Sequence, residues 1–73
     1  MKFKLGDHIQ QIPTADPHYP SLGYGVITSV SDISHAYLIK INDYNGGERW
    51  YIASDIDSFY VLYDSPEGVF YRL

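Results

Sequence analysis

The middle of the chain reads Tyr24-Gly25-Val26-Ile27-Thr28-Ser29-Val30, then Ala36-Tyr37-Leu38-Ile39-Lys40-Ile41, then Glu48-Arg49-Trp50-Tyr51-Ile52-Ala53. These three segments alternate their side chains with a period of two residues, which is typical of strands that bury one face. A small antiparallel sheet must curl on itself to enclose that face. The pattern therefore predicts an all-β fold, a small SH3-like (Tudor-like) barrel of five to six antiparallel strands.

The segments before and after this region extend the same fold. We expect a first strand over Phe3–Ile12, with a bend at the Gly-Asp pair near its start. A final hairpin is expected to pair Phe59–Tyr63 with Val69–Leu73. Proline at the second position and glycine at the fourth position of Ser65-Pro66-Glu67-Gly68 fit a type I turn between these two strands.

The connection between the fourth and fifth strands is short. Ser54-Asp55-Ile56-Asp57 has the spacing of a capping box with Asp in place of Glu. Because so few residues separate the flanking strands, we expect a single helical turn here.

Charged residues predict which way the strands face. If Lys40 lies in solvent, the odd-numbered residues of its strand point inward. If Arg49 lies in solvent, Trp50 and Ile52 point inward and Tyr51 remains on the surface.

The composition limits the classes of protein to which the chain can belong. The chain has 73 residues, no cysteine, eight tyrosines and a net charge of −4. This length predicts a single domain over residues 1–73, in which large tyrosine rings supply the buried area that disulfides supply in other small domains. No signal peptide and no apolar run of about 20 residues is present, so we expect a soluble, cytoplasmic protein without a membrane partner.

The chemistry-bearing residues argue against an enzyme. The carboxylates and serines fall in predicted turns and strand ends, without the context of a general acid or a nucleophile. His8, His18 and His35 match no metal-binding spacing, and the glycine pairs open no phosphate-binding helix. We therefore expect no catalysis, no cofactor and no metal. The five basic residues do not cluster, which argues against nucleic-acid binding.

Several motifs resemble a known family. Phe3-x-Leu5-Gly6-Asp7-His8-Ile9, Gly23-Tyr24-Gly25-Val26-Ile27, Tyr37–Ile41, Trp50-Tyr51-Ile52 and Asp55-Ile56-Asp57 resemble the RNA-polymerase-interacting domain of CarD-type transcription factors and the transcription-repair coupling factor. The resemblance implies a Tudor-like, SH3-like barrel that docks on the polymerase β subunit through an exposed strand edge. The chain departs from the family in its longer stretch between Gly6-Asp7 and Gly23, and in having Ala53 where proline is usual.

Aromatic residues beside the proline-rich stretch Pro13–Ser21 are the candidate partner-binding site, because tyrosines in loops are frequent anchors of protein interfaces. The predicted contact residues are His18, Tyr19, Tyr24, Tyr44, Arg49 and Tyr51. Tyr24 and Tyr51 have an alternative role in capping the core. Such rings also suit a cage for methylated lysine or a proline-rich peptide.

A second kind of binding site is an open strand edge. Gln10–Ile12 and Ser58–Tyr63 are the candidate edges, and the C-terminal strand is expected to cover the latter.

The sequence favours a non-catalytic protein-binding module, a small regulator or inhibitor that docks on a large bacterial machine such as RNA polymerase. One alternative is a phage-encoded inhibitor of a bacterial nuclease complex used in host defence. A second alternative is a nucleic-acid-binding barrel of the KOW or Tudor kind. A homodimer is equally compatible with exposed edges and surface tyrosines.

Overall fold

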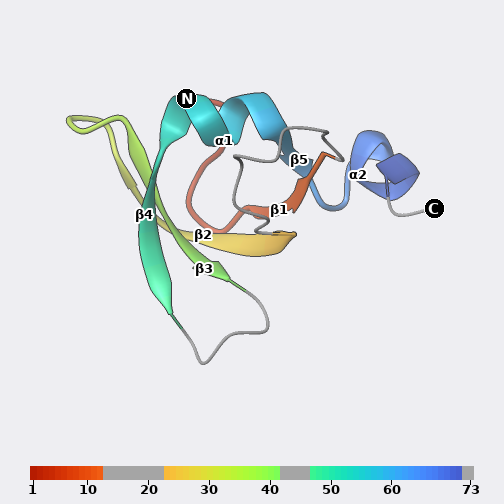
Figure 1. Cartoon of the computed structure of the whole chain (residues 1–73), viewed down its shortest axis with the longest axis horizontal. Helices are drawn as coiled ribbons and strands as arrows, with labels where there is room; N and C mark the ends of the chain where they lie inside the picture. The colour runs from red at the N-terminus through yellow and green to blue at the C-terminus, as the bar shows by residue number, and fades with distance from the viewer. Residues whose placement is uncertain (13–22, 42–46, 72–73) are drawn as a thin grey trace.

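The structure is a computed structural model that describes residues 1–12, 23–41 and 47–71. Its elements are β1(His8–Gln11), β2(Tyr24–Ser31), β3(Ala36–Ile41), β4(Glu48–Ile52), α1(Ala53–Phe59), β5(Tyr60–Leu62) and α2(Pro66–Tyr71). All paired strands are antiparallel, in the order β4-β3-β2-β1-β5 (Figure 1). The predicted antiparallel sheet is therefore confirmed, with two helices in addition to it.

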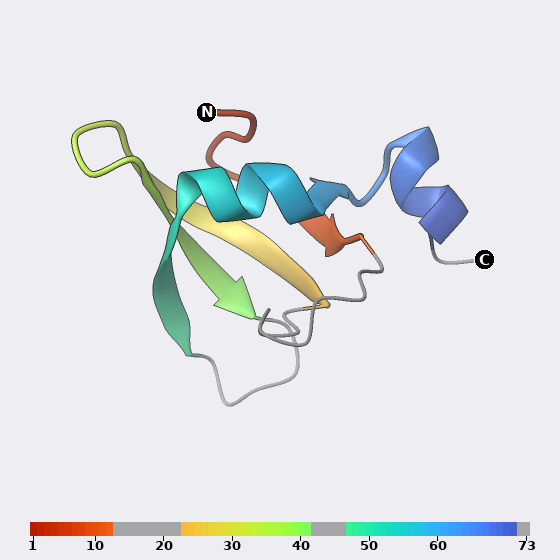
Figure 2. The ribbon, with the colours of Figure 1, turned by 45° about the horizontal axis from the view of Figure 1, so that its top comes forward.

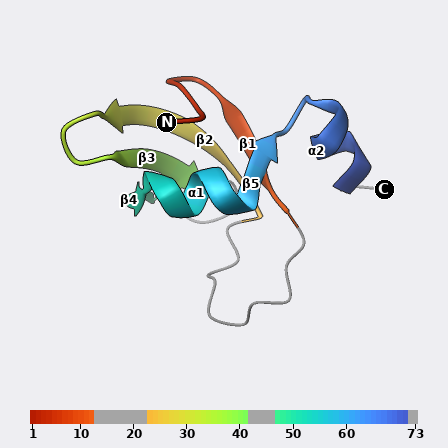
Figure 3. The ribbon, with the colours of Figure 1, turned by 90° about the horizontal axis from the view of Figure 1, so that it is seen from above.

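The sheet is open, so the predicted closure into a barrel is not observed. Within the described part of the chain, β4 and β5 form the two ends of the strand order and do not pair with each other. Helix α1 joins them and crosses one face of the sheet (Figures 2 and 3). It has seven residues where a single turn was expected, and its buried residues Ala53 and Ile56 occupy space that barrel closure would require.

The hydrophobic core lies between the sheet and α1. Each strand supplies side chains from one face, as the period-two pattern requires. The buried cluster consists of Phe3, Ile9, Ile27, Tyr37, Ile39, Ala53, Ile56 and Tyr60, with Val30, Tyr51 and Phe59 packed against it. The inward orientation predicted for Tyr37 and Ile39 is confirmed, whereas the side chain of Ile41 lies outside the described part.

Tyr37 connects the core to the N-terminal segment and to α1. Its ring is fully buried, with its centroid 5.9 Å from that of Phe3. Its hydroxyl accepts a hydrogen bond from the Phe3 backbone N–H (3.0 Å) and donates one to the Asp57 carboxylate (2.6 Å). Asp57 also accepts from the Lys2 backbone N–H at 3.2 Å. Burial, followed by the hydrogen bond to Asp57, raises the pKa of Tyr37 to about 12.

The N-terminal segment bends before β1 begins. Gly6 has a φ of +89°, and the Asp7 carboxylate accepts from the Lys4 N–H at 3.0 Å, which closes the turn. The predicted bend is confirmed, but the strand begins only at His8. The Phe3–Gly6 part of the predicted strand was wrong, because this segment folds over the core instead of extending the sheet.

The faces predicted for β4 were wrong. Tyr51 pairs with Tyr37 and lies against the core, while Trp50 pairs with Leu38 on the opposite face. Trp50 is 54% exposed and Ile52 is 63% exposed. A change of one residue in register exchanges the two faces of a strand, and the register of β4 depends on the connection between β3 and β4.

The predicted C-terminal strand is a helix. Pro66 is the first residue of α2, a position where its missing N–H costs nothing. The Ser65 hydroxyl oxygen accepts from the Gly68 N–H at 3.0 Å and caps the first turn. The stretch Ser65–Gly68 was expected to form a hairpin turn, and it starts a helix instead.

The capping box predicted in α1 was also wrong. Ile52, not Ser54, is the N-cap residue, and its side chain makes no capping hydrogen bond. The helix is held by packing of Ile56 into the core rather than by a polar cap.

Tyr37→Phe should lower the free energy of unfolding by about 1–3 kcal/mol, because Phe3 N–H and Asp57 lose a buried partner. Urea titration measures this change. Tyr71→Phe on α2 is the matched control and should be nearly neutral. An equal effect in the two variants contradicts the central role of the Tyr37 hydroxyl.

Tyr37→Phe should also change how the free energy of unfolding depends on pH above pH 10. The folded protein holds the Tyr37 proton to about pH 12, whereas an unfolded tyrosine releases its proton near pH 10. The stabilisation from Tyr37 is thus complete below pH 10 and is lost as the pH rises towards 12. The stability difference between wild type and Tyr37→Phe should therefore shrink over this range in urea titrations, and a constant difference contradicts the assignment.

Gly68→Ala should displace α2 from β5. A Cβ atom at Gly68 would lie 2.3 Å from the Leu62 carbonyl oxygen and 2.5 Å from that of Tyr63, both backbone atoms. Overpacking of this kind costs about 1–3 kcal/mol, measurable by urea unfolding. Gly47→Ala is the control, since a Cβ there meets no atom within 4 Å. Equal stability of the two variants contradicts this packing.

Candidate functional site

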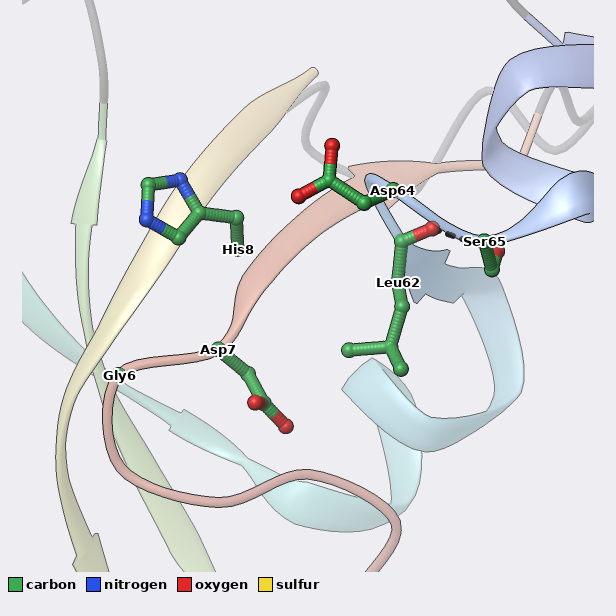
Figure 4. A pocket seen from close by; sticks show the side chains of 6 residues that line it. All are labelled: Gly6, Asp7, His8, Leu62, Asp64 and Ser65. Carbon is green, nitrogen blue, oxygen red and sulfur yellow. Dashed lines mark hydrogen bonds between the residues drawn. The ribbon is translucent and has the colours of Figure 1, made fainter.

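Among the residues that the structure describes, two surface hollows are considered as candidate sites. The first has a volume of about 340 Å³ and lies where the turn before β1 meets the turn after β5. Asp7 and Leu62 extend toward the same space, whereas His8 extends over β2 (Figure 4). The lining residues are Gly6, Asp7, His8, Leu62, Asp64 and Ser65.

Three of the four polar side chains that line this first hollow, those of Asp7, His8 and Ser65, form hydrogen bonds within the domain. The Asp7 carboxylate accepts from Lys4 N–H, and the His8 imidazole Nδ1 is hydrogen-bonded to the Tyr24 hydroxyl. The Ser65 hydroxyl donates to the Leu62 carbonyl (2.6 Å), and its oxygen accepts from Gly68 N–H. These hydrogen bonds give Asp7, His8 and Ser65 structural roles. We therefore interpret the hollow as a junction between two turns.

The second hollow lies beside Trp50, on the outer face of the sheet. It has a volume of about 310 Å³ and is lined by Ser31, Ser34, Ala36 and Trp50. The cross-strand pairs Leu38–Trp50 and Ala36–Ile52 place four apolar side chains on this face. We call this region the Trp50 surface and define it by Ser31, Ser34, Ala36, Leu38, Trp50 and Ile52.

The Trp50 surface combines the features of a protein-binding patch. Its six members carry no charge, and it includes two large apolar side chains that are more than half exposed. Ile33, in the turn that carries Ser34, is 96% exposed. An exposed tryptophan within an apolar patch is typical of interface hot spots.

The structure does not bring the predicted contact residues together. Arg49 and Tyr51 lie on β4, and Tyr24 lies on β2, with β3 between them. Arg49 is exposed, as predicted. His18, Tyr19 and Tyr44 lie outside the described residues.

Tyr51 takes the structural role of capping the core that was the alternative for it, whereas Tyr24 lies outside the core cluster. The Tyr24 ring meets Tyr63 edge-on, with centroids 4.9 Å apart, and both rings lie near His8. Tyr51 packs against the core beside Tyr37. Tyr51 therefore covers the core, whereas Tyr24 packs on the Tyr63 and His8 rings outside the core cluster.

The exposed strand edges also differ from the prediction. β1 pairs with both β2 and β5, so Gln10 and Gln11 are not at an edge. β5 was expected to be covered by the C-terminal strand, but it is an end of the strand order, because the helical C-terminal segment does not extend the sheet beside it. The second edge, β4, was missed together with the exposure of Trp50. The sequence contains one signal for this exposure. A register that pairs Tyr51 with Tyr37, with both rings facing inward, is an alternative for the same hairpin and turns Trp50 outward.

The two described histidines have local roles. His8 bonds to Tyr24, and His35 occupies a left-handed position (φ +49°) in the turn between β2 and β3. Over residues 1–12, 23–41 and 47–71, no group of three His, Cys, Asp or Glu side chains is arranged to hold a metal ion. None of the helices in these ranges has the length and hydropathy needed to cross a membrane.

Comparisons of this chain with protein-family models, with curated proteins and with solved structures found no match.

The exposure of Trp50 can be tested directly, because it is the single tryptophan of the chain. In dilute solution its fluorescence should have the emission maximum of a solvated indole and should be quenched readily by iodide. Trp50→Ala should change the free energy of unfolding by less than about 1 kcal/mol, whereas Tyr51→Ala should cost about 3 kcal/mol. A blue-shifted, unquenched emission contradicts this register of β4.

Proposed function

We propose that this protein is a non-catalytic protein-binding domain that acts through the Trp50 surface. The observation that carries the proposal is the exposure of Trp50 and Ile52 on one face of an edge strand. A partner that covers such side chains gains about 1.5–3 kcal/mol from each of them. Rigid tryptophan rings give this gain with little loss of conformational entropy.

The proposal includes the SH3-like (Tudor-like) class of the fold. The strand order supports it: four strands follow one another as neighbours, and β5 returns after a short helix to pair with β1. The family resemblance adds a partner, bacterial RNA polymerase, and a mode of docking through a strand edge. In this chain the edge with the exposed apolar side chains is β4, so the polymerase would be contacted from β4.

The mode of action follows from what the domain carries. A domain of 73 residues that binds a large assembly regulates or inhibits it by covering a surface or by bridging two components. Its net charge of −4 and dispersed basic residues favour a protein over a nucleic acid as the partner. A bacterial nuclease complex of host defence is the alternative protein partner, and the same experiment separates the two.

The test is capture from a bacterial lysate by the tagged chain, followed by mass spectrometry. Wild type should retain a protein in stoichiometric amount, and Trp50→Ala should reduce capture at least tenfold, as expected for a hot-spot residue. Phe70→Ala is the matched control, because Phe70 is an aromatic residue on α2 that is 68% exposed. It should capture as much as wild type.

Several results would count against the proposal. Capture of no stoichiometric protein, or equal capture by Trp50→Ala and wild type, rejects binding through this surface. RNA polymerase subunits in the captured fraction support docking on the polymerase, and nuclease subunits support the defence alternative. Fluorescence anisotropy with RNA and DNA should show no binding, and binding with a steep salt dependence rejects the protein-binding proposal in favour of a nucleic-acid-binding barrel.

A further inference from the structure

The β4 strand leaves one long side of the sheet open. It pairs with β3 on one side and is the end of the strand order on the other. Natural edge strands are usually protected by proline, a bulge or lysine residues. β4 has no proline or lysine, and its register with β3 runs from Ala36–Ile52 to Lys40–Glu48 without a shift.

The peptide groups that face this open edge can be identified. Ala53 N–H donates to the His35 carbonyl at 2.8 Å, so the peptide group of Ala53 faces β3. Peptide groups of successive residues alternate between the two sides of an antiparallel strand. Arg49 and Tyr51 therefore face β3 as well, and Glu48, Trp50 and Ile52 direct their peptide groups to the open edge.

We infer that β4 pairs with β4 of a second copy of this chain, antiparallel and around a two-fold axis at Trp50. The peptide groups of Glu48, Trp50 and Ile52 face outward and are placed symmetrically about Trp50. A two-fold axis at Trp50 therefore gives each of them a hydrogen-bonding partner in the other copy. Trp50 exchanges two N–H···O bonds with its counterpart, and Ile52 N–H faces the Glu48 carbonyl of the other copy. The two sheets then form one continuous sheet.

The charges of the strand suit this register. Arg49 lies opposite Tyr51 of the other copy, where its guanidinium contacts an aromatic ring, and the two tryptophans face each other on the outer side. A register centred on Arg49 would place two arginines opposite each other. The axis at Trp50 brings no like charges of β4 into direct opposition and uses all five residues of the strand.

The inference goes beyond the proposed function and does not depend on it. The hollow beside Trp50 is lined by Ser31 and Ala36, which lie on the β2 and β3 side, away from the open edge. The Ser31 and Ala36 side of the hollow therefore stays uncovered when β4 is paired, and the dimer presents two such hollows on one face, each with its Trp50 beside the Trp50 of the other copy. A protein partner with two matching sites would bind both.

The experiment measures the mass of the purified chain by sedimentation velocity. A five-residue edge forms a small interface, so the concentration of the chain should be varied from about 5 µM to about 500 µM. We expect a monomer–dimer equilibrium that strengthens with added salt, because salt screens the repulsion between two chains of charge −4.

Two variants test the strand pairing. Ile52→Pro removes an outward N–H at a residue whose φ of −63° already suits proline, so the fold should persist and the dimer should weaken at least tenfold. Ile52→Ala is its control and should stay within about twofold of wild type. Trp50→Lys places two lysines at the axis and should also give a monomer. Circular dichroism confirms that each variant is folded.

The outcomes separate this inference from the proposed function. A wild-type monomer at every concentration, or a dimer that Ile52→Pro and Trp50→Lys leave intact, overturns the pairing of β4. If the chain is monomeric and Trp50→Ala still loses the captured protein, the inference fails and the proposed function stands. If the chain dimerises through β4 and captures nothing, the inference stands and the proposed function fails.

Discussion

The hydroxyl of Tyr37 joins three parts of the chain that are distant in sequence. It accepts from the backbone of Phe3, donates to Asp57 on α1, and belongs to a ring at the centre of the sheet. A hydroxyl that is removed from water must be satisfied within the protein, and here both of its bonds hold segments against the core. The Tyr37 hydroxyl thus links the N-terminal segment and α1 to the sheet, in addition to the burial of Phe3 and Ile56, in a domain without disulfides.

The position of α1 decides which strand edge stays open. Helix α1 follows β4 directly and crosses the face of the sheet to reach β5, with Ile56 buried beneath it. Among the described residues, β4 and β5 are the two ends of the strand order and do not pair with each other, and α1 connects them. The open edge of β4 belongs to this arrangement, and the outward Trp50 follows from the register of β4 against β3. Both the proposed protein-binding surface and the inferred dimer depend on them.

Much of the fold could be predicted from local patterns. The central strands were placed correctly because Gly-bounded, period-two segments leave few alternatives, and the inward faces of Tyr37 and Ile39 followed from Lys40. The faces of β4 could not be predicted, because Arg49 and Glu48 are both charged and the register of a hairpin depends on its connection. The C-terminal helix was missed because Ser65-Pro66-Glu67-Gly68 fits a turn and a helix start equally well. Of the predicted contact residues, Arg49 is exposed, Tyr51 packs against the core, and Tyr24 contacts Tyr63 outside the core cluster.

The sequence by itself determined that short strands would form an antiparallel sheet with tyrosine-rich packing, since alternation and turn residues are local properties. Only the tertiary structure decided which tyrosines are buried and which face of β4 meets solvent, because these depend on the pairing of Tyr51 with Tyr37 across the hairpin. It also decided that the sheet stays open, because α1 occupies the space that closure requires. The exposure of Trp50 depends on the strand pairing and on the position of β4 at the end of the sheet, so no local sequence pattern predicts it.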